Sequence, residues 1–268
     1  MATTSADSMM APDNAMSRGP SASTRTSENG DGPRTLEEAC QRLLSRTDEM
    51  PADEVDRKAD GDKRAEVARK REAWRSLVLS VGRRYEACRL ETFEVGNEEQ
   101  RAILASLRAY ADNVDRHVKA GDNIVLFGPP GTGKDHLAIG VAYVAIGRGF
   151  SVAWFDGQSL YQEFRDNIGG DRPERDIIAR ATRPDILLLS DPVPPRGELT
   201  DYQATILWRV VDRRYRDMRP MWITLNVASG QEASARLGAG IVDRLRDGAT
   251  YGWCGWGSYR KPGSERDR

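Results

Sequence analysis

The chain has 268 residues, of which 39% are apolar and 30% are charged, and its net charge is −1. This composition is typical of a soluble globular protein with a sizeable core. The three cysteines, Cys40, Cys88 and Cys254, show neither zinc-site nor disulfide spacing, which favours the cytoplasm. No apolar run is as long as a membrane span, and the N-terminus lacks the apolar core of a secretory signal.

The N-terminal third divides into two regions. Residues 1–34 are mostly small and polar, so we expect a disordered tail. Thr35-Leu36-Glu37-Glu38 has the capping-box pattern that opens a helix, and a helical, charged region is expected over 35–83. Between Arg57 and Arg84, ten Lys and Arg outnumber four Asp and Glu. A solvated helix face explains this excess, and a surface for DNA or an acidic partner is the alternative.

Short apolar runs alternate with helical patterns in the rest of the chain. The expected strands are 124–127, 151–155, 186–189 and 221–225, and a last short strand is expected within 251–256. This alternation predicts an α/β fold with a parallel sheet and helices on both faces. A second capping box, Thr200 with Gln203, predicts the start of another helix.

A glycine-rich segment between the first strand and the next helix fits the phosphate-binding loop G-x-x-x-x-G-K-[ST], except at its last position. Its residues are Gly128, Pro129, Pro130, Gly131, Thr132, Gly133, Lys134 and Asp135. The glycines allow the backbone N–H groups to approach a phosphate, and Lys134 adds a positive charge near the β- and γ-phosphates. We therefore expect nucleotide binding.

Asp135 stands where the pattern has Ser or Thr, whose hydroxyl normally binds Mg²⁺. A carboxylate can bind Mg²⁺ directly, and the alternative is a degenerate site that binds nucleotide weakly. Ser190 and Asp191 follow the third strand, so we expect them to face Lys134 across the carboxyl edge of the sheet. Asn226 follows the fourth strand, where it would either orient water at a γ-phosphate or form a turn.

In their order, these motifs resemble the DnaC/IstB-type branch of the AAA+ ATPases, which comprises helicase loaders and transposition helper ATPases. The resemblance covers roughly residues 84–261. It rests on Arg84-Tyr85, Phe93, Gln100, the run Gly133-Lys134-Asp135-His136-Leu137, Leu188-Leu189-Ser190-Asp191, Asp212-Arg213-Arg214-Tyr215, Thr224-Leu225-Asn226, Asp243-Arg244-Leu245 and Ser258-Tyr259-Arg260. It implies a P-loop AAA+ domain over 84–262, followed by a short tail at 263–268.

The resemblance also implies roles for individual residues. Lys134 matches the Walker A lysine, and Asp191 matches the Walker B acid that polarises the attacking water. Asn226 matches the sensor-1 position. Arg244 matches the arginine finger that reaches the nucleotide of a neighbouring subunit, and Arg260 matches the sensor-2 arginine. Surface salt bridges are the alternative explanation of both arginines.

ATP and Mg²⁺ are the implied cofactors, with ATP held by residues from Gly128 to His136. The family usually has Thr at the position of Asp135, and Asp-Asp or Asp-Glu at the position of Ser190-Asp191. One position has gained a carboxylate and the other has gained a hydroxyl. We hypothesise a swap in which Asp135, Ser190 and Asp191 form the Mg²⁺ site with its net charge unchanged.

The implied function is that of an ATPase acting as a homo-oligomer to load or remodel a replicative helicase or another DNA-bound complex. The resemblance implies partner contact through residues 35–83 and binding of single-stranded DNA by the core. A transposition helper acting with a transposase is the near alternative. A scaffold that binds ATP without turnover is a second class, supported by Asp135 and Ser190. A small-molecule kinase is disfavoured, because no segment looks like a substrate lid.

Overall fold

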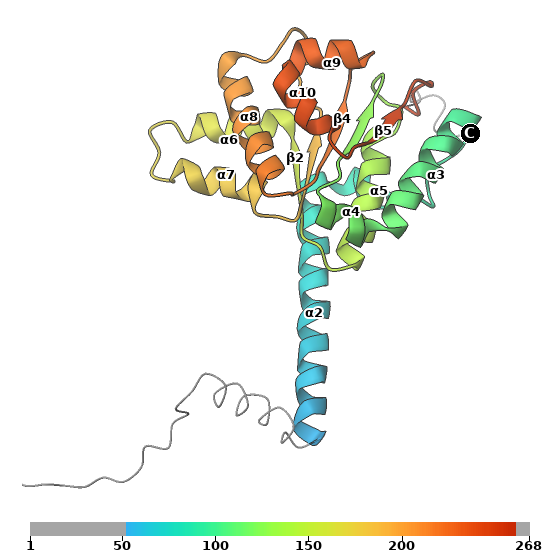
Figure 1. Cartoon of the computed structure of the whole chain (residues 1–268), viewed down its shortest axis with the longest axis vertical. Coiled ribbons are helices and arrows are strands. Elements are labelled where there is room, and N and C mark those ends of the chain that lie inside the picture. Colours follow the sequence, from blue (N-terminus) through green and yellow to red (C-terminus); the bar gives the residue numbers. More distant parts are fainter. Residues whose placement is uncertain (1–51, 261–268) are drawn as a thin grey trace, which may run out of the picture. The chain divides into compact units, whose positions relative to one another are not determined.

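The computed structural model describes residues 52–260, with side chains from residue 61 on. The expected tail at 1–34, the start of the expected helical region at 35–51 and the expected tail at 263–268 lie outside the described residues. The described residues from Arg57 onward belong to one compact unit. Figure 1 shows its elements.

A parallel sheet in the order β2-β3-β4-β1-β5 forms the centre of the fold. Its strands are β1 Ile124–Phe127, β2 Val152–Asp156, β3 Ile186–Ser190, β4 Met221–Leu225 and β5 Thr250–Trp253. The predicted α/β fold with a parallel sheet is therefore confirmed. Because all strands run the same way, their carboxyl ends meet at one edge, where ligands bind in such sheets.

Helices cover both faces of the sheet (Figure 1). The elements are α2 Ala52–Val81, the short 3₁₀ helix η1 Arg83–Tyr85, α3 Glu98–Asp112, α4 Val114–Ala120, α5 Lys134–Gly147, α6 Gly157–Asp166, α7 Glu174–Thr182, α8 Asp201–Arg216, α9 Gly230–Leu237 and α10 Ala239–Arg246. Of these described helices, none combines the length and the apolar character that crossing a membrane requires.

Two hydrophobic cores lie on opposite faces of the sheet because successive strand residues point to opposite sides. Leu126 and Leu188 belong to the core that α3, α4 and α5 close. Leu187 and Ile223 belong to the core that α6 to α10 close. Leu77, near the end of α2, is fully buried in the first of these cores. The end of α2 therefore packs with the residues that follow it. The expected division between a partner-binding region at 35–83 and a domain that begins at residue 84 remains a proposal.

Helix starts and strand ends follow from local hydrogen bonds. The predicted capping box at Thr200 is present, since its side chain accepts from the backbone of Gln203 and the Gln203 side chain accepts in return. The second strand lies one residue later than predicted. Ser151 is held outside it because its backbone N–H and its hydroxyl both donate to Asp185, at 2.9 and 2.7 Å. Asp156 joins the strand by pairing with Ser190.

Candidate nucleotide-binding site

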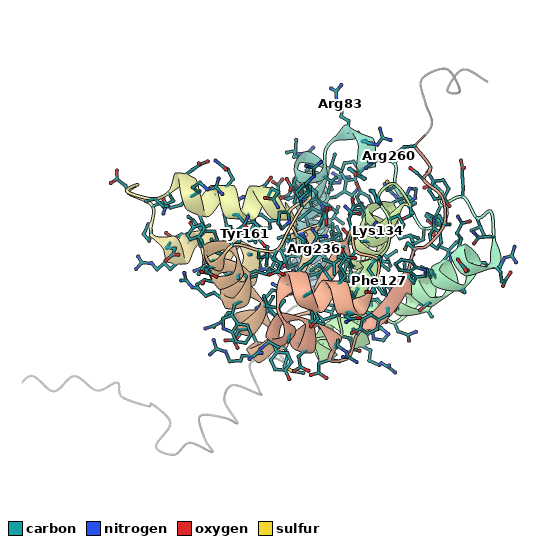
Figure 2. All side chains as sticks on the ribbon, turned by 90° about the horizontal axis from the view of Figure 1, so that it is seen from above. Arg83, Phe127, Lys134, Tyr161, Arg236 and Arg260 are labelled. Carbon is teal, nitrogen blue, oxygen red and sulfur yellow. The ribbon has the colours of Figure 1, made fainter. Side chains whose placement is uncertain are left out.

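A cavity of about 700 Å³ lies at the carboxyl edge of the sheet. Residues from the phosphate loop, from the ends of β3 and β4, and from the segments before α3 and after β5 line it. Its lining includes the charged or hydrogen-bonding side chains of Lys134, Asp135, Asp191, Thr224, Asn226 and Arg260. Lys134 and Arg260 lie on the same side of the protein in Figure 2. The sheet topology thus brings together residues that are far apart in the sequence.

The glycines of the loop have backbone conformations and neighbours that exclude a side chain. Gly128 and Gly131 have φ angles of 144° and 85°, values that L-residues rarely adopt. A Cβ atom on Gly128 would lie 2.3 Å from the carbonyl oxygen of Cys254, and one on Gly131 would lie 2.1 Å from Ser258 Oγ. Glycine is therefore required at both positions, by the backbone conformation and by the close approach of the C-terminal segment.

Two hydrogen bonds join the loop to the C-terminal segment of the described chain. The indole Nε1 of Trp256 donates to the carbonyl of Thr132 at 2.9 Å, and the backbone N–H of Tyr259 donates to the carbonyl of Gly131, also at 2.9 Å. The same segment carries Arg260 to the rim of the cavity. The position of Arg260 thus depends directly on the shape of the loop.

Lys134 is buried, and its ammonium group donates to two carbonyls of its own loop. The distances from Nζ are 2.9 Å to the Gly128 oxygen and 2.7 Å to the Pro129 oxygen. Burial lowers the pKa of the Lys134 ammonium, because leaving water disfavours the charged form. Phosphate oxygens at the loop would replace these carbonyl contacts with a charged partner.

Asp135 contacts hydroxyls from two neighbouring strands. Ser190 Oγ donates to Asp135 Oδ1 at 2.9 Å, and Thr224 Oγ1 donates to the same oxygen at 2.7 Å. The sequence had placed Asp135 and Ser190 at one site, and they are in direct contact. It had not assigned Thr224 to that site. The available signal was a polar residue among the apolar residues of β4, a strand that is buried throughout.

Asp191 and Asn226 form a pair at the carboxyl ends of β3 and β4. The backbone N–H of Asn226 donates to Asp191 Oδ1 at 3.2 Å, and its side-chain amide donates to Oδ2 at 2.5 Å. Asp191 has a φ of 44°, a strained conformation of the kind found at functional sites. Burial raises the pKa of its carboxyl, while the Asn226 hydrogen bonds oppose that rise in pKa. Asn226 therefore orients the carboxylate.

Aromatic side chains close the side of the cavity next to the start of α5. The Phe93 ring lies 5.5 Å from the His136 ring and 5.6 Å from the Tyr259 ring, edge to face in both cases. A ring nitrogen of His136 lies 2.8 Å from the backbone oxygen of Arg89. His136 thus connects the segment before α3 to the phosphate loop.

Arg236 of α9, labelled in Figure 2, holds the loop after β3 against the end of β4. Its guanidinium donates to the carbonyls of Pro194, Gly197 and Asn226. The sequence does not mark this residue because, apart from Glu232 on the same helix, its partners are backbone atoms distant in the chain. Arg236 therefore fixes the backbone that follows Asp191 and the backbone at Asn226.

Arg244 lies apart from this cavity. Its Nη2 is 3.1 Å from Asp212 Oδ1, and its guanidinium stands 4.1 Å from the centre of the Trp208 ring. It lines a smaller cavity beside residues 120–123, where β1 begins, and therefore near the opposite edge of the sheet. The structure thus brings together all the expected site residues of one subunit except Arg244. Its action on a neighbouring subunit stays a prediction.

Comparison with known proteins identifies one family. A family model described as "IstB-like ATP binding protein" matches residues 66–265. The "Replicative helicase loader DnaC" of Escherichia coli (strain K12) is 27% identical over 179 residues, which cover 66% of this chain and 70% of that protein. The "Uncharacterized protein YdaV" of the same strain is 27% identical over 178 residues, covering 65% of this chain and 68% of that protein.

Solved structures of the same fold agree with this match. The crystal structure of the DnaC helicase loader superposes with a TM-score of 0.58 at 20% identity, covering 64% of this chain and 99% of that one. The crystal structure of DnaI gives a TM-score of 0.54 at 16% identity, with coverages of 67% and 94%. At these identities the structures show a shared fold, which is that of the AAA+ P-loop NTPases.

Proposed function

Because the chain belongs to the family of IstB-like ATP-binding proteins, we propose that it hydrolyses ATP to load or remodel a replicative helicase or another DNA-bound complex. The observation that carries this proposal is the convergence of the phosphate loop, Asp191 and Asn226 on one cavity. A loop alone would support binding, whereas an oriented carboxylate beside it supports activation of water. The relatives named as replicative helicase loaders support the choice of partner.

In this proposal the residues of one subunit divide the chemistry between them. The loop N–H groups and Lys134 bind the phosphates, and Asp191, held by Asn226, polarises the attacking water. Arg260 places a second cation at the rim, where negative charge develops on the transferred phosphoryl group. His136 and Phe93 set the position of the loop relative to the segment before α3.

The donor set fits Mg²⁺, which prefers oxygen ligands and is commonly bound through one or two carboxylates. Asp135 and Asp191 would provide the carboxylates, and the Ser190 hydroxyl would hold Asp135 in place through the hydrogen bond that it donates. The bound ion would neutralise charge on the β- and γ-phosphates. The 2.9 Å contact between Ser190 and Asp135 supports the hypothesis that these two positions have exchanged a carboxylate and a hydroxyl.

The ATPase test compares phosphate release at increasing protein concentration, with and without single-stranded DNA. If catalysis needs a neighbouring subunit, the rate per chain is expected to rise steeply with concentration. Binding to single-stranded DNA is expected to weaken with added salt, because it depends on phosphate contacts. Tight ATP binding without phosphate release at any concentration would instead identify a non-hydrolysing scaffold.

The choice between helicase and transposase is tested by binding. The full-length protein with ATP is expected to associate with the replicative helicase of its own host in size-exclusion chromatography. Association with a transposase and not with the helicase would replace the helicase-loading proposal by that of a transposition helper.

The exchange at the metal site is tested with Asp135→Thr, Ser190→Asp and the double variant. Each single change is expected to lower the ATPase rate. Asp135→Thr removes a carboxylate, and Ser190→Asp places a second carboxylate next to that of Asp135, where the two repel each other. The double variant is expected to recover part of the activity, because it restores one carboxylate and one hydroxyl. Asp201→Thr, in the first turn of α8, is the matched control. A double variant no better than the worse single one would contradict the exchange.

A further inference from the structure

The two oxygens of the Asp135 carboxylate have different surroundings. Oδ1 accepts hydrogen bonds from Ser190 and Thr224. Among the residues whose side chains the structure describes, 61–260, none donates to Oδ2, and no Lys, Arg or His forms an ion pair with Asp135. The carboxylate is therefore oriented through one oxygen, and its other oxygen remains available to a ligand.

The two hydroxyls that orient Asp135 are fixed by the sheet. Ser190 and Thr224 are paired residues on the adjacent strands β3 and β4. Both are buried, with 9% and 1% of their surface exposed. Their positions are set by the strand backbones before any ligand binds. Groups held in this way need little reorganisation to bind a cation.

A second carboxylate faces the same cavity. Asp191 lines it together with Asp135, and its oxygens accept hydrogen bonds from the neutral Asn226. The ammonium of Lys134 donates to loop carbonyls instead of to either carboxylate. The negative charge of these two groups is therefore not neutralised by a direct ion pair within the described residues.

We propose that this cavity binds a divalent cation before nucleotide arrives, with Asp135 as a direct ligand and with Ser190 and Thr224 positioning it. The inference rests on the proposed function, because the same ion would then meet the phosphates of ATP. A P-loop Ser or Thr offers the metal only a neutral hydroxyl. A carboxylate adds a full negative charge, and Coulomb attraction to a divalent ion then favours binding without the phosphates. Within the described residues, no three His, Cys, Asp or Glu side chains are grouped so that they could hold a metal ion, so water would complete the coordination of Asp135 and Asp191.

The test is a titration of the nucleotide-free, full-length protein with Mn²⁺, followed by the loss of the electron paramagnetic resonance signal of the free ion. We expect one saturable site per chain, from which Mg²⁺ displaces Mn²⁺. Because no nucleotide is present, the measurement does not depend on ATPase activity. Absence of a saturable site in the wild-type protein would overturn the inference.

Variants separate the metal ligand from its positioning residues. Asp135→Asn and Asp135→Thr are expected to weaken Mn²⁺ binding by more than about 100-fold. Ser190→Ala and Thr224→Val are expected to weaken it by about 10- to 100-fold, the range typical of groups that orient a metal ligand. Asp201→Asn, also in a first helical turn, is the control and should leave binding unchanged. Mn²⁺ binding that persists in both Asp135 variants would overturn the assignment.

The same titration in the presence of ATP distinguishes this inference from the proposed function. Mn²⁺ binding that requires ATP would refute the inference and leave the ATPase proposal standing. Failure to bind ATP, with or without the ion, would refute the proposed function itself. Thermal unfolding of each variant shows whether a loss of binding reflects a loss of the fold.

Discussion

Replacement of Arg214 by methionine is expected to lower the free energy of unfolding by roughly 1–3 kcal/mol, the cost of leaving buried hydrogen-bonding groups unsatisfied. Arg214 is fully buried, and its guanidinium donates to backbone carbonyls from the end of α7 to the start of β4. These acceptors are the carbonyls of Ala181, Thr182, Pro184, Asp185 and Pro220. Methionine fills similar space but leaves buried acceptors without donors, which is more costly than losing the contacts alone.

The measurement is a urea titration, in which the midpoint should fall while the slope stays constant. The neighbouring Arg213 provides the control, because its side chain is exposed and pairs with Asp217 on the surface. Arg213→Met should cost less than about 1 kcal/mol. Equal effects of the two substitutions would show that the buried contacts of Arg214 do not stabilise the fold.

Replacement of Arg244 by alanine is expected to reduce the ATPase rate of the assembled protein by about 10³–10⁵-fold, the range seen for arginine fingers in other P-loop enzymes. The reason is that a guanidinium from the neighbouring subunit would stabilise charge developing on the phosphoryl group. For this role Arg244 must leave Asp212 and Trp208, with which it interacts in the single chain. The rate per chain should also lose its dependence on protein concentration.

Mixing experiments sharpen this prediction. Arg244→Ala keeps every residue of its own nucleotide site, whereas Lys134→Ala lacks a residue of that site. Mixed assemblies contain interfaces in which an intact site meets an intact finger, so mixing two inactive variants should restore part of the activity. Arg246→Ala, in the last turn of the same helix, serves as the control. An Arg244→Ala protein with normal activity, or mixtures without recovery, would contradict action on a neighbouring subunit.

The sequence predicted the parts of the fold that depend on local patterns. Apolar runs located the strands of the sheet, because a buried parallel strand is apolar on both faces. The phosphate loop was recognisable because its glycines and lysine lie in one continuous segment. The rule that ligands bind at the carboxyl ends of parallel strands then placed Asp191 and Asn226 beside Lys134, as the cavity lining shows.

The contacts that sequence analysis missed depend on the register between strands or on backbone partners. Thr224 meets Asp135 because β3 and β4 pair Ser190 with Thr224, and pairing cannot be read from either strand alone. Arg236 and Arg214 donate mainly to backbone carbonyl groups. Every residue has such a group, so the residue types in the sequence do not indicate which carbonyls accept these hydrogen bonds. The ion pair of Arg244 with Asp212 likewise depends on the packing of α10 on α8, which the sequence of neither helix reveals.

The attachment of the phosphate loop to Trp256 and Tyr259 has a thermodynamic consequence. A glycine-rich loop has many accessible conformations in the unfolded chain, and restricting them costs entropy. Here the hydrogen bonds from Trp256 and Tyr259 restrict the loop in the folded protein without nucleotide. Nucleotide therefore meets a loop whose shape is already set, and more of the phosphate interaction energy appears as affinity.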